Sequence, residues 1–460
     1  MYERIAKTYV DLVQRARGWD YRPMLAKLET LEFASPEVIA EYRRERLRKL
    51  LAHCARNVPF YRREWKRLGF DPEWVKGTED LAPLPVLDKS VLRSEYPAFL
   101  DERGTGAADD WVTSGATGEP FAFRLDKQSI AANTFAALAR GRRWWGVDFG
   151  VREAMIWSGV RDVSGALHGA IVAMRRRLSW RLKNIVLVDI YSLDERAVAL
   201  AYRRLLRFQP RLIRAISSGL FRFCEGLEKL GLDGIKLGVR AAIYTGEGMT
   251  PVQRRLIERV LGCRTICEYG CGELGIIAFE CPSGGLHLSH ENMIFEFIRE
   301  GRAALPGEEA SLVVTNLNSY VSPLVRYSVG DLVVPSDEAC ACGRRMPLLQ
   351  SVIGRTHDAI RTPNGRVIHA LFFTHLFDEF PSVHQFRVVQ SRIDSVRIEL
   401  RSSATIEPSA LAFIERSVSF AMGGGALVDV AQVAELPISP NGKTPWIISK
   451  IDSDESPPGR

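Results

Sequence analysis

The stretch TSGATG is the first part of the chain whose residue types and spacing could do chemistry. Gly115 and Gly118 allow the backbone to turn tightly and to approach a ligand closely, and Thr113, Ser114 and Thr117 add hydroxyl groups. Backbone N–H groups and hydroxyl groups together form a concave surface that suits an oxyanion such as a phosphate. Because the Gly-Lys-Ser/Thr ending of the Walker pattern is absent, a plain turn is the alternative interpretation.

Two acidic motifs further along the chain offer ligands for a metal ion and for a sugar. In EYGCGE, Glu273 follows Tyr269 and Gly270, and a carboxylate after such a turn suits a hard cation such as Mg²⁺. In RYSVGD, Asp331 follows a glycine at an expected strand end, where an acid can accept both hydrogen bonds of a ribose diol. Each motif alone could be a surface turn.

Two basic motifs complete the series. IGRTHD holds Arg355 and Asp358, and SPNGKTPW sets Lys443 on a loop bounded by proline and glycine. Either could also be a surface turn, because lysine and arginine are mostly solvated. The five motifs become specific through their order, which is a hydroxyl–glycine loop, Tyr-Gly-x-Gly-Glu, Tyr-x-x-Gly-Asp, Gly-Arg-x-x-Asp and Gly-Lys.

In this order the motifs resemble the adenylate-forming superfamily. The branch that looks closest contains the phenylacetate–CoA ligases and the adenylyltransferases of capsule and coenzyme biosynthesis. Four longer segments are similar to the same branch: RNVPFYRREWKRLG, EDLAPLPVLDKSVLR, TNLNSYVSPLVRYSVGDLV and CACGRRMPLLQSVIGRTHD. The resemblance covers nearly all of residues 40–450. It implies an α/β fold, with a large N-terminal adenylate-forming domain of several subdomains and a smaller, mobile α+β C-terminal domain.

The resemblance also implies a role for each motif. The hydroxyl–glycine loop would hold the β- and γ-phosphates of ATP, the TGEG segment at 245–248 would line the adenine, and Asp358 would be a hinge between the two domains. Mg²⁺ would be held by Thr117 and Glu273. The implied catalytic residues are Lys443, Glu273 and Thr117. The implied nucleotide-binding residues are Thr113, Ser114, Gly115, Gly118, Gly246, Glu247, Tyr269, Gly270, Asp331 and Arg355.

Two residues of the loop depart from the family pattern. Glu119 stands where lysine is common, and Ala116 stands where threonine or serine is usual. A carboxylate about 4 Å from a phosphate charge would repel it by ~4 kcal/mol at an effective dielectric constant of about 20. We therefore expect Glu119 to point away from ATP, to pair with an arginine, or to loosen phosphate binding, and impaired adenylation stays open.

The cysteines suggest a second kind of site. Cys281, His287, Cys340 and Cys342 offer three thiolates and an imidazole, which is a sound tetrahedral set for structural zinc. Their alternative interpretation is reduced cysteines in turns. The cysteines at 263, 267 and 271 lie in a segment that reads as a strand, so buried thiols are favoured there over an iron–sulfur site.

Regular elements must position these motifs. Residues 36–68 are expected to be helical, because the segment 36–57 has helical spacing of apolar residues, and Pro59 ends the run. From about 110 to 280, short β-rich runs alternate with amphipathic helices, which predicts a largely parallel sheet.

We expect an N-terminal domain over 1–354, with a helical region at about 36–100, an α/β core at about 110–280 and a β-subdomain at about 285–350. A hinge at 355–360 and a small domain at 361–460, ending in a disordered tail, would follow.

The bulk composition excludes several classes of protein. The 460 residues carry a net charge of +7, with 46% hydrophobic and 25% charged residues, which is ordinary for a globular protein. No nucleic-acid motif, secretory signal or membrane span is recognisable, so we expect a cytoplasmic protein with no nucleic-acid partner. The arginine-rich stretch 175–183 predicts a solvated helix or loop surface, with a membrane or a coenzyme phosphate as alternatives.

The resemblance implies a ligase that uses ATP to convert a carboxylic acid to an acyl-adenylate, releases pyrophosphate and transfers the acyl group to coenzyme A. One alternative acceptor is an amine, a hydroxyl or a carrier protein, and a second alternative is a degenerate, non-catalytic binding subunit. Relatives suggest a homodimer. An aromatic acid would suit an aromatic slot, although the same residues could be core: Trp144, Trp145, Trp157, Phe221 and Tyr244.

Overall fold

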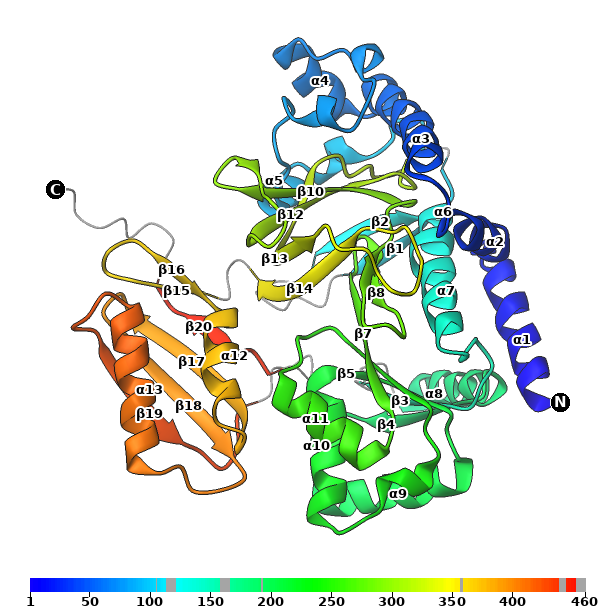
Figure 1. Cartoon of the computed structure of the whole chain (residues 1–460). Helices are drawn as coiled ribbons and strands as arrows, with labels where there is room; N and C mark the ends of the chain where they lie inside the picture. Colours follow the sequence, from blue (N-terminus) through cyan, green and yellow to red (C-terminus); the bar gives the residue numbers. More distant parts are fainter. Residues whose placement is uncertain are drawn as a thin grey trace.

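A computed structural model describes residues 1–104, 106–112, 121–157, 166–191, 193–355, 359–437 and 444–451, with only the backbone given for 166–173 and 371. Figure 1 shows an N-terminal helical region, a long sheet that runs through the body of the molecule, and a separate C-terminal unit to one side. The α/β class expected from the sequence is confirmed.

Four helices begin the chain. They are α1 (Tyr2–Ala16), α2 (Arg22–Leu31), α3 (Pro36–Asn57) and α4 (Pro59–Leu68). The helix expected over 36–68 is present as two helices that meet at Val58, whose backbone is extended. Pro59 begins α4, because its missing N–H costs nothing at a helix start. The helices α1 and α2 were not expected from the sequence, although α1 buries Ala6, Val10 and Gln14 at four-residue spacing.

Short elements connect this region to the sheet. They are the 3₁₀ turns η1 (Pro72–Trp74), η2 (Glu79–Leu81) and η3 (Tyr96–Phe99), the helix α5 (Lys89–Ser94), and a hairpin of β1 (Ala108–Val112) and β2 (Ala122–Asp126). Leu87, just before α5, forms a bridge to Tyr327. The start of α5 is therefore fixed against the middle of the main sheet.

Twelve strands of the described chain form the main sheet. In sheet order they are β11 (Arg302–Ala303), β10 (Met293–Arg299), β12 (Ala310–Asn316), β13 (Tyr327–Ser336), β14 (Leu348–Arg355), β9 (Leu286–Leu288), β8 (Gly275–Glu280), β7 (Arg264–Cys271), β6 (Ala241–Thr245), β5 (Leu212–Ile216), β3 (Glu153–Trp157) and β4 (Ile185–Asp189). The strands from β4 to β7 pair in parallel, and the other pairs are antiparallel. Strand pairing is thus continuous across the α/β core and the β-rich region that the sequence suggests.

Helices alternate with the parallel strands, as the sequence predicts. They are a continuous helical run of α6 (Lys127–Ser129), η4 (Ile130–Ala136) and α7 (Ala137–Trp144), then α8 (Ala166–Leu182), α9 (Glu195–Phe208), α10 (Ser217–Lys229), the turn η5 (Gly234–Leu237) and α11 (Pro251–Leu261). The helix α11 begins with a capping box between Thr250 and Gln253, which satisfies two backbone donors. It packs beside β7 and thereby helps to fix the strand that carries Glu268 and Tyr269.

The C-terminal unit has its own small core. It contains the hairpin β15 (Ala359–Arg361) and β16 (Val367–His369), the helices α12 (Ala370–Asp378) and α13 (Pro408–Ala421), and a sheet ordered β19 (Leu427–Gln432), β18 (Ser395–Ser402), β17 (Val383–Arg392) and β20 (Ile447–Ser449). Its apolar side chains form a cluster separate from those of the main body. Arg401 on β18 reaches Glu225 on α10 at 2.6 Å, so a buried ion pair joins the two parts.

Candidate active site

Three strands bring Tyr269, Asp331 and Arg355 into contact. The Tyr269 hydroxyl donates a hydrogen bond of 2.7 Å to Asp331 Oδ2, and Arg355 Nε lies 3.1 Å from Asp331 Oδ1. Asp331 and Arg355 face each other directly across β13 and β14. Burial and the neighbouring Asp331 carboxylate raise the pKa of Tyr269 well above its usual range, so the phenol keeps its proton and acts as the donor.

The predicted metal ligand Glu273 is paired with a lysine that sequence reasoning missed. Glu273 follows β7, and its side chain is only 7% exposed, while Lys89 Nζ at the start of α5 lies 2.7 Å from Glu273 Oε1. A buried carboxylate needs a positive partner, and here the ammonium group supplies the positive charge. A lysine that follows a short apolar run has no distinctive sequence signal. Its position beside Glu273 becomes clear only in the structure, where Leu87, two residues earlier, forms a bridge to Tyr327.

The TGEG segment lies at the end of β6, beside β7. Thr245 at the end of β6 pairs directly with Glu268 on β7. Gly246 and Tyr269 are the next residues after this pair along their two parallel strands. Glu247 accepts hydrogen bonds from the backbone N–H of Ser218 at 3.0 Å and of Thr444 at 2.7 Å. The chain next to the predicted catalytic lysine therefore touches the segment predicted to line the adenine.

A close approach of the Trp446 side chain to the backbone of Gly248 reinforces this contact. A Cβ atom at Gly248 would lie 2.6 Å from the Trp446 ring, which is closer than any real Cβ contact. The absence of a side chain at 248 thus allows the indole to lie against the loop. Thr444 and Trp446 are further contact residues that the sequence motif did not identify.

Several predicted residues lie outside the described residues. These are the loop residues Thr113, Ser114, Gly115, Ala116, Thr117, Gly118 and Glu119, the hinge residue Asp358 and the lysine Lys443. The last strand residues before the loop are described: Trp111 Nε1 lies 3.9 Å from where a Cβ atom on Gly272 would stand. The hairpin from Tyr269 to Glu273 is therefore a neighbour of the strand that leads into the loop.

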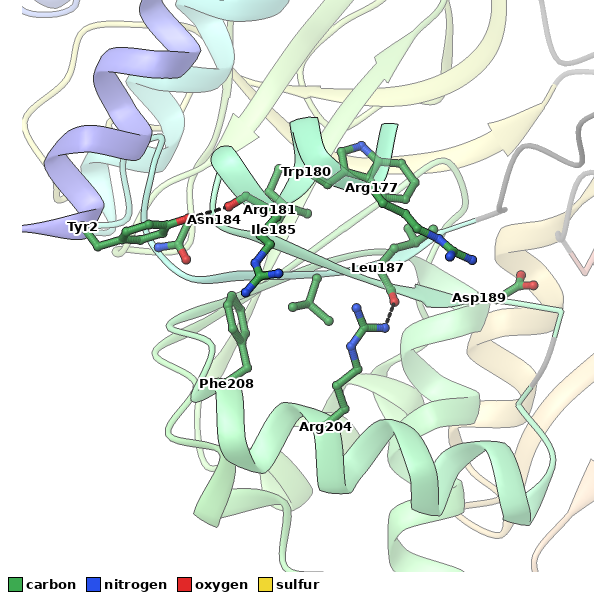
Figure 2. A pocket seen from close by; sticks show the side chains of 11 residues that line it. Tyr2, Arg177, Trp180, Arg181, Asn184, Ile185, Leu187, Asp189, Arg204 and Phe208 are labelled. Carbon is green, nitrogen blue, oxygen red and sulfur yellow. Dashed lines mark hydrogen bonds between the residues drawn. The ribbon is translucent and has the colours of Figure 1, made fainter. Parts of the chain in front are cut away.

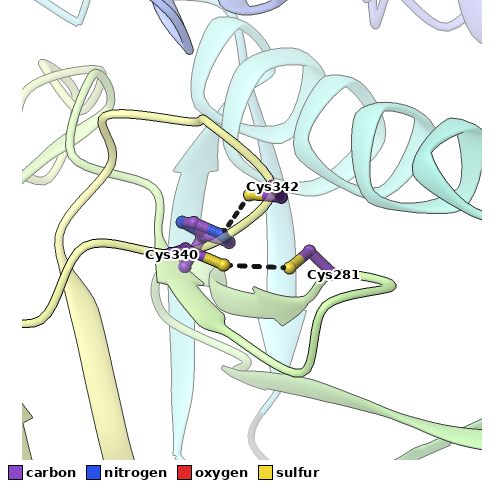
Figure 3. A group of neighbouring side chains, drawn as sticks. Cys281, Cys340 and Cys342 are labelled. Carbon is purple, nitrogen blue, oxygen red and sulfur yellow. Dashed lines mark hydrogen bonds between the residues drawn. The ribbon is translucent and has the colours of Figure 1, made fainter.

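A second cluster joins Cys281, His287, Cys340 and Cys342 (Figure 3). Their ligand atoms all lie within 4.8 Å of one another. Cys281 Sγ is 3.5 Å from Cys340 Sγ, too far for a disulfide, and Cys342 Sγ is 3.2 Å from His287 Nε2. All eight cysteines of the chain fall within the described residues, and all are free thiols.

The surroundings of the cluster fix its geometry. His287 Nδ1 lies 3.3 Å from the Met346 carbonyl oxygen, and a proton on Nδ1 leaves Nε2 free to bind a metal. A Cβ atom on Gly285 would lie 2.7 Å from Cys340 Sγ. The glycine therefore leaves room for the four ligands to approach one another.

The aromatic residues expected to line one slot belong to different packing clusters. Phe221 and Tyr244 are buried in the core between β5, β6 and α10, and Trp157 packs against that core. Trp144 and Trp145 pack against another cluster, and Trp144 meets His287 edge-to-face. The core interpretation therefore holds better than a shared slot.

The remaining cysteines and the arginine-rich stretch are also placed. Cys263, Cys267 and Cys271 lie on or beside β7, and burial raises the pKa of the first two thiols to about 12. The three side chains are half-buried rather than fully buried, and in the described part of the chain they belong to no cluster that could hold a metal ion. Arg175, Arg177 and Arg181 are exposed at the end of α8.

Comparisons with known proteins match the fold. Residues 360–450 match the model of the CapK C-terminal domain family. The phenylacetate-coenzyme A ligase of Thermus thermophilus is 29% identical over 351 residues, which cover 74% of each chain. A structure of 2-hydroxyisobutyryl-CoA ligase in the postadenylation state, in complex with R3-HIB-AMP, superposes with a TM-score of 0.71 at 19% identity and 91% coverage of both chains. The same ligase in its thioesterification state, with 2-HIB-AMP and CoA, gives a TM-score of 0.58 at 20% identity and the same coverage.

In the part of the chain that the structure describes, no helix combines the length and the apolar character needed to cross a membrane.

Proposed function

Because the chain belongs to the adenylate-forming superfamily, in the branch of the phenylacetate–CoA ligases and CapK, we propose that it is a ligase that activates a carboxylic acid with ATP and transfers the acyl group to coenzyme A. The contact of Tyr269, Asp331 and Arg355 supports this proposal most directly, because residues from three separate motifs of the predicted order meet within hydrogen-bonding distance.

The reaction has two steps. A carboxylate oxygen of the acid attacks the α-phosphorus of ATP and expels pyrophosphate, which leaves an acyl-adenylate. The sulfur of coenzyme A then attacks the acyl carbon, and AMP leaves. Both reactants of the first step are anions, so catalysis depends on alignment and on positive charge where negative charge gathers.

We assign the residues as follows. Asp331 accepts the ribose hydroxyl groups, while Tyr269 and Arg355 hold its carboxylate in place. Glu273 would hold Mg²⁺ together with Thr117, and the geometry at Lys89 implies that Lys89 moves aside when the metal binds. Glu247 positions the segment that carries Lys443, which would contact the α-phosphate.

The domain orientation is also proposed. The TM-score is higher against the postadenylation structure than against the thioesterification structure. This difference supports an assignment of the present orientation to the adenylation half of the cycle. A rotation at Asp358 would then bring another face of the C-terminal unit to the site.

We further propose that Cys281, His287, Cys340 and Cys342 hold a structural zinc ion. Three thiolates and one imidazole are a closed tetrahedral set, and the atom separations within the cluster suit Zn–S bonds of about 2.3 Å. The ion would tie the turn after β8 to β9 and to the loop between β13 and β14.

The test of the ligase is pyrophosphate release over a panel of aliphatic and aromatic acids, followed by mass spectrometry of acyl-CoA when coenzyme A is added. Asp331→Asn should lose activity, and Asp110→Asn, whose side chain is 90% exposed, should not. Pyrophosphate without acyl-CoA would favour an amine, hydroxyl or carrier-protein acceptor. Absence of both ATP binding and pyrophosphate release would favour the degenerate binding subunit.

The homodimer stays a prediction, and light scattering of the purified protein checks it.

A further inference from the structure

The helices α1 and α8 form one flank of the molecule, away from the C-terminal unit in Figure 1. The start of α1 touches the end of α8, because the Tyr2 hydroxyl donates a hydrogen bond of 2.8 Å to the Arg181 carbonyl oxygen. We call the exposed surface of these two helices the α1/α8 flank. The proposed ligase reaction uses none of its residues.

Large apolar side chains are exposed along this flank. On α8, Met174, Leu178 and Leu182 are 65%, 57% and 38% exposed, and their four-residue spacing places them on one side of the helix. On α1, Ile5 and Leu12 are 56% and 59% exposed. The three apolar side chains of α8 therefore form one exposed row, which indicates a binding surface rather than chance exposure.

Arginines are interspersed with these apolar side chains. On α8 the exposed ones are Arg175, Arg177 and Arg181, and at the other helix they are Arg4, Arg15 and Arg17. The segment 174–182 contains no acid. The acids of α1 are engaged, since Glu3 lies 3.3 Å from Arg211 and Asp11 accepts a hydrogen bond from Tyr21. The flank is therefore both apolar and positively charged.

A cavity of about 820 Å³ opens beside the flank, between α8, β4 and α9 (Figure 2). Arg177, Arg181 and Arg204 line it together with Trp180 and Phe208. Its floor is the apolar edge strand β4, where Arg204 Nη1 donates a hydrogen bond of 3.1 Å to the Leu187 carbonyl oxygen. The acidic lining residue is Asp189, at the exposed end of the strand. An apolar floor beneath several guanidinium groups suits a molecule with an anionic head and an apolar chain.

We propose that the α1/α8 flank docks on an anionic lipid surface and that the adjacent cavity receives a phosphate-bearing lipid headgroup. Arginines and exposed leucines on one helix face, with Trp180 and Tyr2 beside them, are the composition that binds at the boundary of a bilayer. A second copy of the chain is a poor occupant, because the two basic faces of a symmetric contact would repel each other.

The test is co-flotation of the full-length protein with vesicles of phosphatidylcholine alone and with vesicles that also contain phosphatidylglycerol. Binding is expected only to the anionic vesicles, and it should weaken when the salt concentration rises to about 0.5 M. Charge reversal in Arg177→Glu/Arg181→Glu should lower the partition into anionic vesicles at least about tenfold. Met174→Ser/Leu178→Ser should lower it as well.

The matched controls lie on α13, in the C-terminal unit. Arg416 and Phe420 are exposed there, so Arg416→Glu and Phe420→Ser make the same chemical changes away from the flank. The proposal is overturned if the wild type fails to bind anionic vesicles or if the control variants lose binding equally. Pyrophosphate release in solution is expected to be unchanged in all four variants, which shows that they fold. If a flank variant loses vesicle binding but keeps normal catalysis, its defect lies in the α1/α8 flank. If the wild type shows no catalysis, the proposed function is wrong, whatever the result with vesicles.

Discussion

At the scale of single residues, the site depends on how Asp331 is held. Its carboxylate accepts one hydrogen bond from Tyr269 and lies against Arg355, so a neutral amide at 331 would keep the shape of the site and lose the charge. For Asp331→Asn we expect the KM for ATP to rise at least about tenfold, because hydrogen bonds to charged groups contribute about 1.5–3 kcal/mol. Steady-state pyrophosphate release measures this. An unchanged KM for ATP, in a variant that melts like the wild type, would contradict the assignment.

Lys89 allows a second prediction at this scale. Its ammonium group neutralises Glu273, so a divalent cation must compete with it for the same oxygen. For Lys89→Met we expect the Mg²⁺ concentration at half-maximal activity to fall up to about fivefold, since a partly exposed ion pair contributes about 1 kcal/mol or less. Lys76→Met, at an exposed position on a nearby loop, is the control. A higher Mg²⁺ requirement in Lys89→Met would show that the lysine supports the metal site instead.

At the scale of elements, a buried ion pair joins the helix α7 to the main sheet. Arg140 on α7 and Glu291 between β9 and β10 lie 2.5 Å apart, with their side chains 3% and 0% exposed. Glu291→Gln leaves the Arg140 charge without a partner, and this should lower the free energy of unfolding by about 3–5 kcal/mol. Denaturant titration measures the change. Glu300→Gln, at an 82% exposed side chain, should change it by less than about 0.5 kcal/mol.

The proposed zinc cluster connects three strands, so loss of the metal should destabilise that part of the sheet. The protein as purified should contain about one equivalent of zinc, and a chelator or Cys340→Ser should lower the Tm by several degrees. Metal analysis and thermal unfolding measure these effects. Cys263→Ser replaces a thiol outside the cluster and should retain the zinc. A metal-free preparation with an undiminished Tm would refute the proposal.

The alternation of strands and helices could be predicted from the sequence, because apolar periodicity follows burial on one or two faces. The helix α1 could also have been found, since Ala6, Val10 and Gln14 repeat every four residues. The partner of Glu273 could not, because Lys89 is 184 residues away in the chain and resembles any surface lysine. The aromatic residues failed as a slot because hydrophobic side chains show no preference between a core and a ligand until the tertiary packing is known.

At the scale of the whole molecule, the orientation of the two parts depends on few polar contacts. Burial alone would raise the pKa of Glu225, but the His384 imidazole, whose Nδ1 lies 3.7 Å from the carboxylate, and the hydrogen-bonded Arg401 guanidinium outweigh it and lower the pKa to about 2. The contribution of Glu225 to docking is therefore complete above its ordinary pKa of about 4.5. It disappears as the pH falls from there towards about 2.

Arg401→Ala should loosen the C-terminal unit at neutral pH. The variant leaves the Glu225 carboxylate largely buried without its guanidinium partner, so orientations that release it into water become more populated. Small-angle scattering should show a larger radius of gyration, and the ratio of acyl-CoA formation to pyrophosphate release should change. Arg397→Ala, on the same strand but paired with Asp429 inside the C-terminal unit at 2.9 Å, should alter neither. An identical scattering profile for Arg401→Ala would mean that other contacts hold the orientation.

Gly248 offers a way to favour one half-reaction of the proposed catalytic cycle over the other. The indole of Trp446 lies against the backbone there, so a methyl group at 248 would push the C-terminal unit away from the main body. Alanine would add a small side chain at 248 and valine a larger one, so the displacement should be larger in the valine variant. If the C-terminal unit rotates as proposed, a graded series of this kind should shift activity progressively from pyrophosphate release towards acyl-CoA formation.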